Sequence, residues 1–280
     1  MPEATVLVTG GNSGIGFVVS RELARSGASL VMLCRSEEKA RRAQESIVRD
    51  VPGAQVELLI ADLACRQSIR EAAEAYSRRF SRLDVLVNNA GALHSRKELT
   101  PDGIELTFAA NHLGPFLLTR LLEPVLRKTP GARVVNVSSE LHRQSRLRLD
   151  EVSDPPRYDP WTAYSDSKLC NVLFTYGLAA RVPGDVTVNC LHPGVVATGF
   201  ARQATDIRSL ALRASRWLLK RPEDGARCAL RLARSPEVAG VSGQYFDEDG
   251  REAPSSPLSR DQGLIQGLWK LSEEMTGLSA

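Results

Sequence analysis

A tyrosine and a lysine lie four residues apart in the segment Tyr164-Ser-Asp-Ser-Lys168. On a helix, residues at this spacing share one face, with Cβ atoms about 6 Å apart, so both side chains would project into one site. A free tyrosine, with a pKa of about 10, exchanges protons poorly at neutral pH. A lysine ammonium about 4 Å away would lower that pKa by up to about 3 units, less the cost of burial. The pair could therefore donate and accept protons, although the same spacing on an ordinary amphipathic helix usually serves packing.

A glycine-rich stretch, Thr9-Gly-Gly-Asn-Ser-Gly-Ile-Gly16, follows the apolar run Thr5–Thr9 near the start of the chain. The run predicts a strand buried on both faces. Gly10, Gly14 and Gly16 let the backbone bend and approach a pyrophosphate at the N-terminus of the next helix. Between a first strand and a first helix, this pattern predicts a dinucleotide site. The predicted contacts in this turn also include Asn12, Ser13 and Ile15.

The end of the second predicted strand bears on the choice between NAD and NADP. An acidic residue usually stands there when NAD is bound, accepting from the ribose 2′-hydroxyl. Here the residues are Leu33-Cys-Arg-Ser36, with Lys39 one helical turn further on. The guanidinium of Arg35 matches a 2′-phosphate. This favours NADP(H) over NADH, the alternative being that Arg35 is a solvated charge at a strand end.

Two later strand ends offer further cofactor contacts. Asp62, followed by Leu63, comes after the third predicted strand, where its carboxylate could accept from adenine. The fourth strand closes with Asn88-Asn-Ala-Gly91. The small residues in this segment, among them Asn89, Ala90 and Gly91, would fit against the cofactor.

Strands and helices alternate along the whole chain. Further strands are predicted at 29–34, 56–60, 85–88, 133–137 and 186–191, and helices at about 66–80, 103–128 and 161–181. Such alternation predicts βαβ units with right-handed crossovers. We therefore expect an α/β protein with one domain over 1–280, a Rossmann fold with a doubly wound parallel sheet of about seven strands flanked by helices. Residues 1–135 would be mainly the cofactor-binding half and 136–280 the catalytic and substrate-binding half.

Two segments interrupt this alternation, at 140–160 and at about 194–221. Both follow the carboxyl ends of strands, where ligands bind in such sheets, so they are candidates for a pocket wall and a lid. Surface decoration is the alternative for both. The arginines of the first segment, at 143, 146 and 148, would suit an anionic substrate or simply face water. The second segment carries leucines at 210, 212, 218 and 219, which would suit a lid over a lipophilic substrate. A final apolar helix is predicted from Leu264, Leu268, Trp269 and Leu271, serving packing or an interface.

The composition is that of an ordinary globular protein, with 42% hydrophobic and 25% charged residues. A net charge of +3 with scattered arginines argues against nucleic acid. The five cysteines include no C-x-x-C pair, which indicates buried free thiols in a reducing compartment rather than disulfides or a metal site. No apolar run approaches about 18 residues, and the first strand begins near Ala4. We therefore expect no transmembrane segment, no signal peptide and a cytoplasmic location.

Taken together, these motifs resemble the short-chain dehydrogenase/reductase family over nearly the whole chain. They occur in the family's order: T-G-x-x-x-G-x-G at 9–16, N-N-A-G at 88–91, a serine at the end of the fifth strand, Y-x-x-x-K at 164–168, and Pro193-Gly194. Within the family the chain most resembles the retinol dehydrogenase-like branch. That similarity rests on Cys34-Arg35, Asn111-His-Leu-Gly114, Asn136-Val-Ser-Ser139, Lys168–Phe174 and Leu191-His-Pro-Gly194.

The resemblance implies a catalytic role for four residues. Tyr164 would be the general acid in reduction and the base in oxidation, while Lys168 lowers its pKa and holds the nicotinamide ribose. Ser139, with Ser138 as the alternative, would bind the substrate oxygen. Asn111 would hold a water in a proton relay to Lys168.

The surroundings of these residues complete the implied site. Pro115 supplies no N–H to the carbonyl of Asn111, four residues back, so that acceptor would be free for the relay water. Pro193 and Gly194 would lie beside the nicotinamide, and Thr198 would reach its carboxamide. The four histidines are not expected to lie near one another, and no spacing predicts a metal site. Nor does the serine have the partners of a hydrolase triad.

The sequence thus predicts an NADP(H)-dependent oxidoreductase of the carbonyl reductase type. It would interconvert a lipophilic aldehyde or ketone and an alcohol. Two alternatives remain: an NADP(H)-binding sensor or scaffold without turnover, and a reductase of a C=C bond. A small-molecule substrate is the expected partner. Family members commonly form homodimers or homotetramers through the helices at about 103–128 and 161–181, a surface that the apolar tail could cover.

Overall fold

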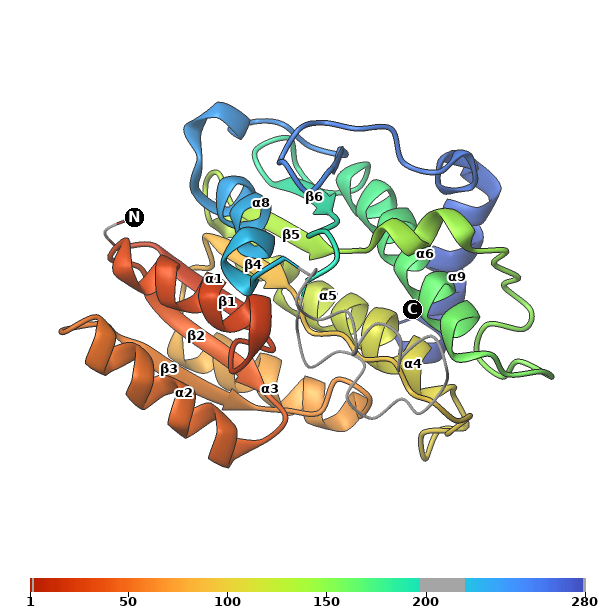
Figure 1. The fold of residues 1–280 in the computed structure, drawn as a ribbon, viewed down its shortest axis with the longest axis horizontal. Coiled ribbons are helices and arrows are strands. Elements are labelled where there is room, and N and C mark those ends of the chain that lie inside the picture. Colours follow the sequence, from red (N-terminus) through yellow and green to blue (C-terminus); the bar gives the residue numbers. More distant parts are fainter. Residues whose placement is uncertain (2, 197–219, 279–280) are drawn as a thin grey trace.

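A parallel sheet forms the centre of the molecule. The computed structural model describes residues 1, 3–196 and 220–278 (Figure 1). Seven strands pair in the order β3-β2-β1-β4-β5-β6-β7, and every pairing is parallel. The strands are β1 (Thr5–Thr9), β2 (Ser29–Cys34), β3 (Val56–Ile60), β4 (Val85–Asn88), β5 (Arg133–Val137), β6 (Thr187–Leu191) and β7 (Tyr245–Phe246). The predicted α/β class and doubly wound sheet are confirmed.

Helices connect the strands and cover the sheet. They are α1 (Gly14–Arg25), α2 (Glu37–Asp50), α3 (Arg66–Arg79), α4 (Leu106–Phe108), α5 (Gly114–Lys128), α6 (Pro160–Ala179), α8 (Pro222–Arg234) and α9 (Gln262–Thr276). A π-helical turn at Ala109–Leu113 joins α4 to α5, so the predicted helix at about 103–128 is one nearly continuous run. Two elements were not predicted by position, β7 and α8.

The two faces of the sheet have separate apolar layers. Along β1, Val6 and Val8 pack against α1, α2 and α8, whereas Leu7 points to the opposite face. On that face the layer comes from α3, α5 and α6, with one residue from α9. Successive side chains of a strand point to opposite faces because the sheet is pleated. Both faces are buried, which explains why the strands appear in the sequence as continuous apolar runs.

The final helix, α9, packs against α5 and α6 (Figure 1). The ring of Trp269 lies 5.2 Å from that of Phe116 and 6.1 Å from that of Phe174, centroid to centroid. Two guanidinium groups flank the indole, Arg120 at 5.1 Å and Arg181 at 4.2 Å. The predicted apolar tail is therefore a packed helix, and it covers the face shared by α5 and α6.

The carboxyl ends of β1, β4, β5 and β6 meet at one edge of the sheet, where the strand order reverses between β1 and β4. Ligands of doubly wound sheets bind at such a switch point. Of the predicted lid, the structure describes residues 194–196 and 220–221, and the N–H of Lys220 donates to the Val195 carbonyl (3.1 Å). Thr198 and the leucines at 210–219 lie outside the described residues. Among the residues that are described, no helix is both long and apolar enough to cross a bilayer.

Candidate active site

The glycine turn links β1 to the N-terminus of α1. Gly10 and Gly14 adopt positive φ values of 66° and 53°, and the N–H of Gly10 donates to Leu33 at the end of β2 (2.8 Å). A Cβ on Gly16 would overlap the backbone oxygen of Gly10, so only glycine permits this close approach. Ser13 precedes α1 in an extended conformation without a side-chain cap. The N–H groups of the first turn are therefore suited to bind phosphate.

The end of β2 lies against this turn. The Sγ atom of Cys34 interacts with the backbone N–H groups of Gly11 and Asn12, but burial outweighs them and raises the pKa of the thiol to about 11. Next to it, Arg35 and Lys39 are exposed, and within the described part of the chain neither side chain has a hydrogen bond or ion pair. A glycine cradle beside two available cations fits a dinucleotide with a 2′-phosphate.

The segment after β4 is held to β1 and faces the catalytic lysine. Thr9 Oγ1 accepts from the N–H groups of Asn89 and Ala90, both at 3.0 Å, and Asn89 Nδ2 donates to the Thr9 carbonyl (2.9 Å). A Cβ on Gly91 would lie 3.2 Å from Lys168 Nζ. The structure thus brings the predicted N-N-A-G segment beside Lys168.

The predicted catalytic pair lies on α6, as expected. This helix begins at Pro160, and Asp159 caps its N-terminus by accepting a hydrogen bond from the N–H of Thr162 (2.8 Å). Tyr164 and Lys168 are 8% and 2% exposed. Lys168 Nζ lies 5.5 Å from the centroid of the Tyr164 ring and donates to the Val137 carbonyl at the end of β5 (3.0 Å).

The two serines after β5 have different partners. Ser138 is buried and its hydroxyl donates to the Lys168 carbonyl (2.8 Å), which ties β5 to α6. Ser139 shares a side-chain hydrogen bond with Tyr164. It also caps the short 3-10 helix Glu140–Gln144, accepting from the N–H of Leu141 (3.3 Å). The geometry therefore supports Ser139 over Ser138 as the residue that would bind a substrate oxygen.

Burial dominates the protonation of this pair. It raises the pKa of Tyr164 above its ordinary value of 10, and the hydrogen bond with Ser139 offsets only part of that rise. It also lowers the pKa of Lys168 to about 8. The expectation that Lys168 brings the phenol toward neutrality is not met by the described residues, because desolvation opposes charge on both groups. Tyr164 therefore keeps its proton at pH 7.

Asn111 lies in the π-helical turn and connects three segments. Its Oδ1 accepts from the N–H of Ala92 (2.8 Å), and its Nδ2 donates to the Ala92 carbonyl (2.8 Å) and to Ser167 Oγ (3.0 Å). The side chain thus fixes the segment after β4 against α6. The wider turn ends at Leu113, two residues before Pro115, which cannot donate to Asn111, in line with the predicted irregularity.

An apolar wall adjoins Tyr164. Leu93 is buried with it, and the partly buried Leu141 and Trp161 pack against them. Since Leu141 belongs to the 140–160 segment, at least this part of the predicted pocket wall reaches the site. Two arginines of that segment are paired with acidic side chains: Arg143 pairs with Glu140 (2.5 Å) and Arg148 with Asp150 (2.9 Å).

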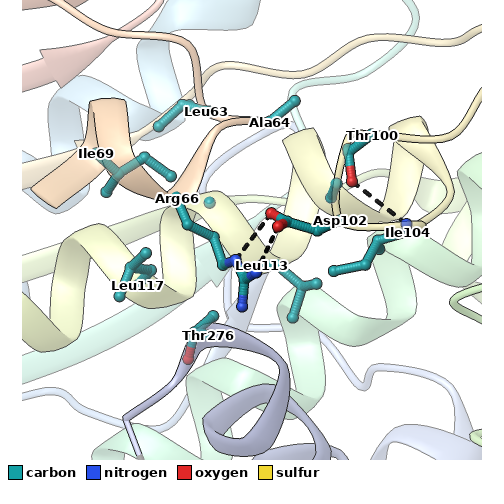
Figure 2. A pocket seen from close by; sticks show the side chains of 12 residues that line it. Leu63, Ala64, Arg66, Ile69, Thr100, Asp102, Ile104, Leu113, Leu117 and Thr276 are labelled. Carbon is teal, nitrogen blue, oxygen red and sulfur yellow. Dashed lines mark hydrogen bonds and ion pairs between the residues drawn. The ribbon is translucent and has the colours of Figure 1, made fainter.

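One hollow lies away from these residues, at the beginning of α3 (Figure 2). Leu63 and Thr276 are among the residues that line it. Arg66 Nε donates to Asp102 Oδ2 there (2.8 Å). Asp62, just before Leu63, accepts from the N–H of Ala64 (2.9 Å). None of the four predicted catalytic residues lines this hollow.

The prediction that the histidines lie apart is wrong for two of them. The imidazoles of His142 and His192 both contact the ring of Tyr245, at centroid distances of 4.9 and 6.1 Å. The sequence analysis missed this cluster because its members are far apart in the chain. The one signal in the sequence was that His142 follows Ser139 by three residues, about one helical turn, which places its ring near the serine. The described residues include no group of three His, Cys, Asp or Glu side chains that could hold a metal ion.

Known proteins are similar to this chain in sequence and in fold. A model of the short chain dehydrogenase family matches residues 4–208. Human retinol dehydrogenase 14 is 40% identical over 291 aligned residues, covering 98% of this chain and 86% of that protein. The crystal structure of an uncharacterized Mycobacterium paratuberculosis protein matches with a TM-score of 0.77 at 34% identity, covering 99% of this chain and 96% of the other. A Shigella flexneri short chain dehydrogenase complexed with NADP gives 0.71 at 27% identity, with coverage of 89% and 98%.

The fold and the site together define an oxidoreductase with a doubly wound dinucleotide-binding sheet. The chain belongs to the short-chain dehydrogenase/reductase family, and within it to the retinol dehydrogenase-like group. Its reaction class is therefore the interconversion of alcohols and carbonyl compounds.

Proposed function

We propose that this protein is an NADP(H)-dependent oxidoreductase that reduces a lipophilic aldehyde or ketone, or oxidises the corresponding alcohol. The observation that carries the proposal is the arrangement on α6, where Tyr164 shares a hydrogen bond with Ser139 and Lys168 Nζ lies over its ring. Nothing in simple cofactor binding requires a buried tyrosine and a serine to meet in this way.

NADP(H) is supported by the glycine cradle and by the end of β2. Arg35 and Lys39 are exposed beside the turn, at the position where an acidic residue would favour NAD. The Shigella flexneri relative was crystallised with NADP. We assign the adenosine half to Asp62 and Leu63, and the nicotinamide half to Gly91, Pro193, Gly194 and Thr198.

The protein residues supply the proton and bind the substrate oxygen. Bound NADP(H) supplies or accepts the hydride. Tyr164, which holds its proton at neutral pH, donates it to the carbonyl oxygen during reduction. Ser139 donates a hydrogen bond to the same oxygen and so stabilises the negative charge that develops there. Lys168 binds the ribose hydroxyls, and Asn111 fixes the segment after β4 against α6, next to the path by which the proton is replaced.

The apolar wall supports a lipophilic substrate. Leu93, Leu141 and the half-buried Trp161 form one apolar cluster with Tyr164. Human retinol dehydrogenase 14, by its name, acts on retinol. We propose that residues 1–135 form mainly the cofactor half, 136–280 the catalytic half and 194–221 the lid. A cytoplasmic location is supported by five free cysteines, of which four are buried.

The test is NADPH oxidation at 340 nm with retinal, medium-chain aldehydes, aromatic aldehydes and cyclic ketones, with NADH in parallel. Turnover should fall by about 10²- to 10⁴-fold in Tyr164→Phe while NADPH still binds. Unchanged turnover in that variant would refute the mechanism. Tight NADPH binding without turnover of any substrate would favour the silent sensor, and a saturated product from an enone would favour C=C reduction.

A further inference from the structure

Three rings from three segments pack together near Ser139. Tyr245, on β7, contacts His142, from the 3-10 helix after β5, and His192, from the loop after β6. The planes of His142 and Tyr245 are inclined by 49°, and those of His192 and Tyr245 by 17°. His142 comes three residues after Ser139 and His192 two residues before Gly194, so this ring cluster adjoins both parts of the proposed site.

His142 binds the backbone of Ser139. Its Nδ1 lies 2.7 Å from the Ser139 carbonyl, which can only accept, so Nδ1 carries the proton and donates. Its Nε2 accepts from the N–H of Ser256, at 3.0 Å. Both ring nitrogens of this 1% exposed imidazole are thereby committed. Burial lowers the pKa of His142, which keeps the ring in the neutral form that these two bonds require.

His192 binds the backbone of its own loop, after β6, but as an acceptor rather than a donor. The N–H of Gly194 donates to its Nδ1 (3.2 Å), so the proton lies on Nε2, which faces Glu140 Oε2 at 3.5 Å. Glu140 Oε2 also accepts from the hydroxyl of Tyr245 (3.2 Å). Burial opposes the charge of Glu140, but the nearby Arg143, His192 and Tyr245 outweigh it and lower its pKa. Burial likewise lowers the pKa of His192.

We propose that His142 and His192, which both pack on Tyr245, are positioning residues. His142 fixes Ser139 through its carbonyl, and His192 fixes the Gly194 N–H. The ring cluster thereby sets the distance between the residue that would bind the substrate oxygen and the loop that would face the nicotinamide. This inference rests on the proposed function for its catalytic meaning, but its structural content can be measured without turnover.

Paired substitutions separate positioning by His142 from packing. His142→Phe keeps the ring on Tyr245 and removes both hydrogen bonds. His142→Asn keeps a donor near the Nδ1 position, and His142→Gln keeps an acceptor near the Nε2 position. We expect kcat to fall by about tenfold or more in the Phe and Gln variants, because a small displacement of a reacting group is costly. The Asn variant should stay within about threefold of wild type, since it retains the hydrogen bond that matters.

The matched control is Tyr176→Phe. Tyr176 binds Ser255 (2.6 Å), the neighbour of Ser256, and is buried, but it has no contact with Ser139. The Tyr176→Phe substitution therefore loosens the same C-terminal segment without affecting the contacts of Ser139. We expect it to lower the melting temperature and leave kcat unchanged.

Two readouts do not depend on activity. In protein labelled with ¹³Cζ-tyrosine, the Tyr164 signal, assigned with Tyr164→Phe, should shift in His142→Phe because its bond with Ser139 is displaced, and should stay in place in Tyr176→Phe. The Kd of NADPH, followed by its fluorescence, should rise about fivefold in His192→Phe, as expected for the loss of one hydrogen bond. It should not change in His142→Phe.

Different outcomes refute the positioning by the histidines and the proposed function. If Asn and Gln variants of His142 lose kcat equally, or if the Tyr164 signal does not move in His142→Phe, positioning of Ser139 is refuted. If NADPH binds His192→Phe as tightly as wild type, positioning of Gly194 is refuted. If the wild-type protein turns over no carbonyl while the NMR and binding changes occur as expected, the proposed function fails and the positioning stands.

Discussion

Replacement of Trp269 by alanine should remove the main attachment of α9. The side chain is 7% exposed and packs against both Phe116 and Phe174, with Arg120 and Arg181 beside the indole. Tryptophan buries up to about 250 Å², which at about 25 cal/mol per Å² is worth about 6 kcal/mol as an upper bound. Measured Trp→Ala costs are about 3–5 kcal/mol, and the two cation–π contacts place this residue in the upper part of that range.

The free energy of unfolding in urea is the measurement, with Lys270→Ala as the control. Lys270 is the next residue of α9 and its side chain is 81% exposed, so its removal should cost less than about 0.5 kcal/mol. Light scattering during size-exclusion chromatography adds a second readout. Because α9 covers the face of α5 and α6, wild-type protein should not self-associate through that face, whereas Trp269→Ala should.

A cost below about 1.5 kcal/mol for Trp269→Ala, with an unchanged m-value, would refute this account of the packing. So would a wild-type dimer that is disrupted by substitutions on the α5 surface beneath α9. Either result would mean that the α5–α6 face is available to a second subunit.

Three further perturbations follow from the site and the core. Arg35→Glu should weaken NADPH binding by about 10- to 100-fold and leave NADH binding nearly unchanged. Equal losses of affinity for both cofactors would refute the assignment of Arg35 to the 2′-phosphate. Because the pKa of Tyr164 is raised by burial, kcat for alcohol oxidation should still be rising at pH 9, while carbonyl reduction should not; an oxidation plateau at pH 7 would contradict this. Burial lowers the pKa of His112 from 6.5 to about 3, so as the pH falls the imidazole is protonated in the unfolded chain before it is protonated in the folded protein. The contribution of His112 to the free energy of unfolding is therefore fully present above pH 6.5 and is lost as the pH falls toward 3. By pH 5 this loss is about 2 kcal/mol of the free energy of unfolding. His112→Phe should therefore lose about 2 kcal/mol less than wild type between pH 7 and pH 5, as measured by urea unfolding.

Local patterns predicted the elements that position the site. The apolar run at Thr5–Thr9 and the glycines after it need only their immediate neighbours to define a strand and a tight turn. The Tyr164–Lys168 spacing has meaning on any helix. β7, by contrast, has two residues and no period to detect. The start of α8 did carry a signal, since Pro222 is followed by Glu223 and Asp224 in the first turn, and its position was nevertheless not predicted.

Long-range contacts and burial are what the sequence could not supply. His142, His192 and Tyr245 become neighbours only when β5, β6 and β7 align in the sheet. The same limit explains the wrong direction for the Tyr164 pKa. A spacing of four residues predicts attraction between a phenolate and an ammonium, but the desolvation of both depends on the surrounding core.

The position of α9 on α5 and α6 also has a consequence for synthesis of the chain. The face that carries Phe116 and Phe174 is complete once α6 has been made, yet its cover begins only at Gln262. At ribosomal rates the delay is on the order of ten seconds. During that time an aromatic surface next to the helix of Tyr164 and Lys168 is open to solvent, and a chaperone that recognises such surfaces has time to bind. The helix that carries the proposed proton donor therefore acquires its full support only after most of the polypeptide has left the ribosome.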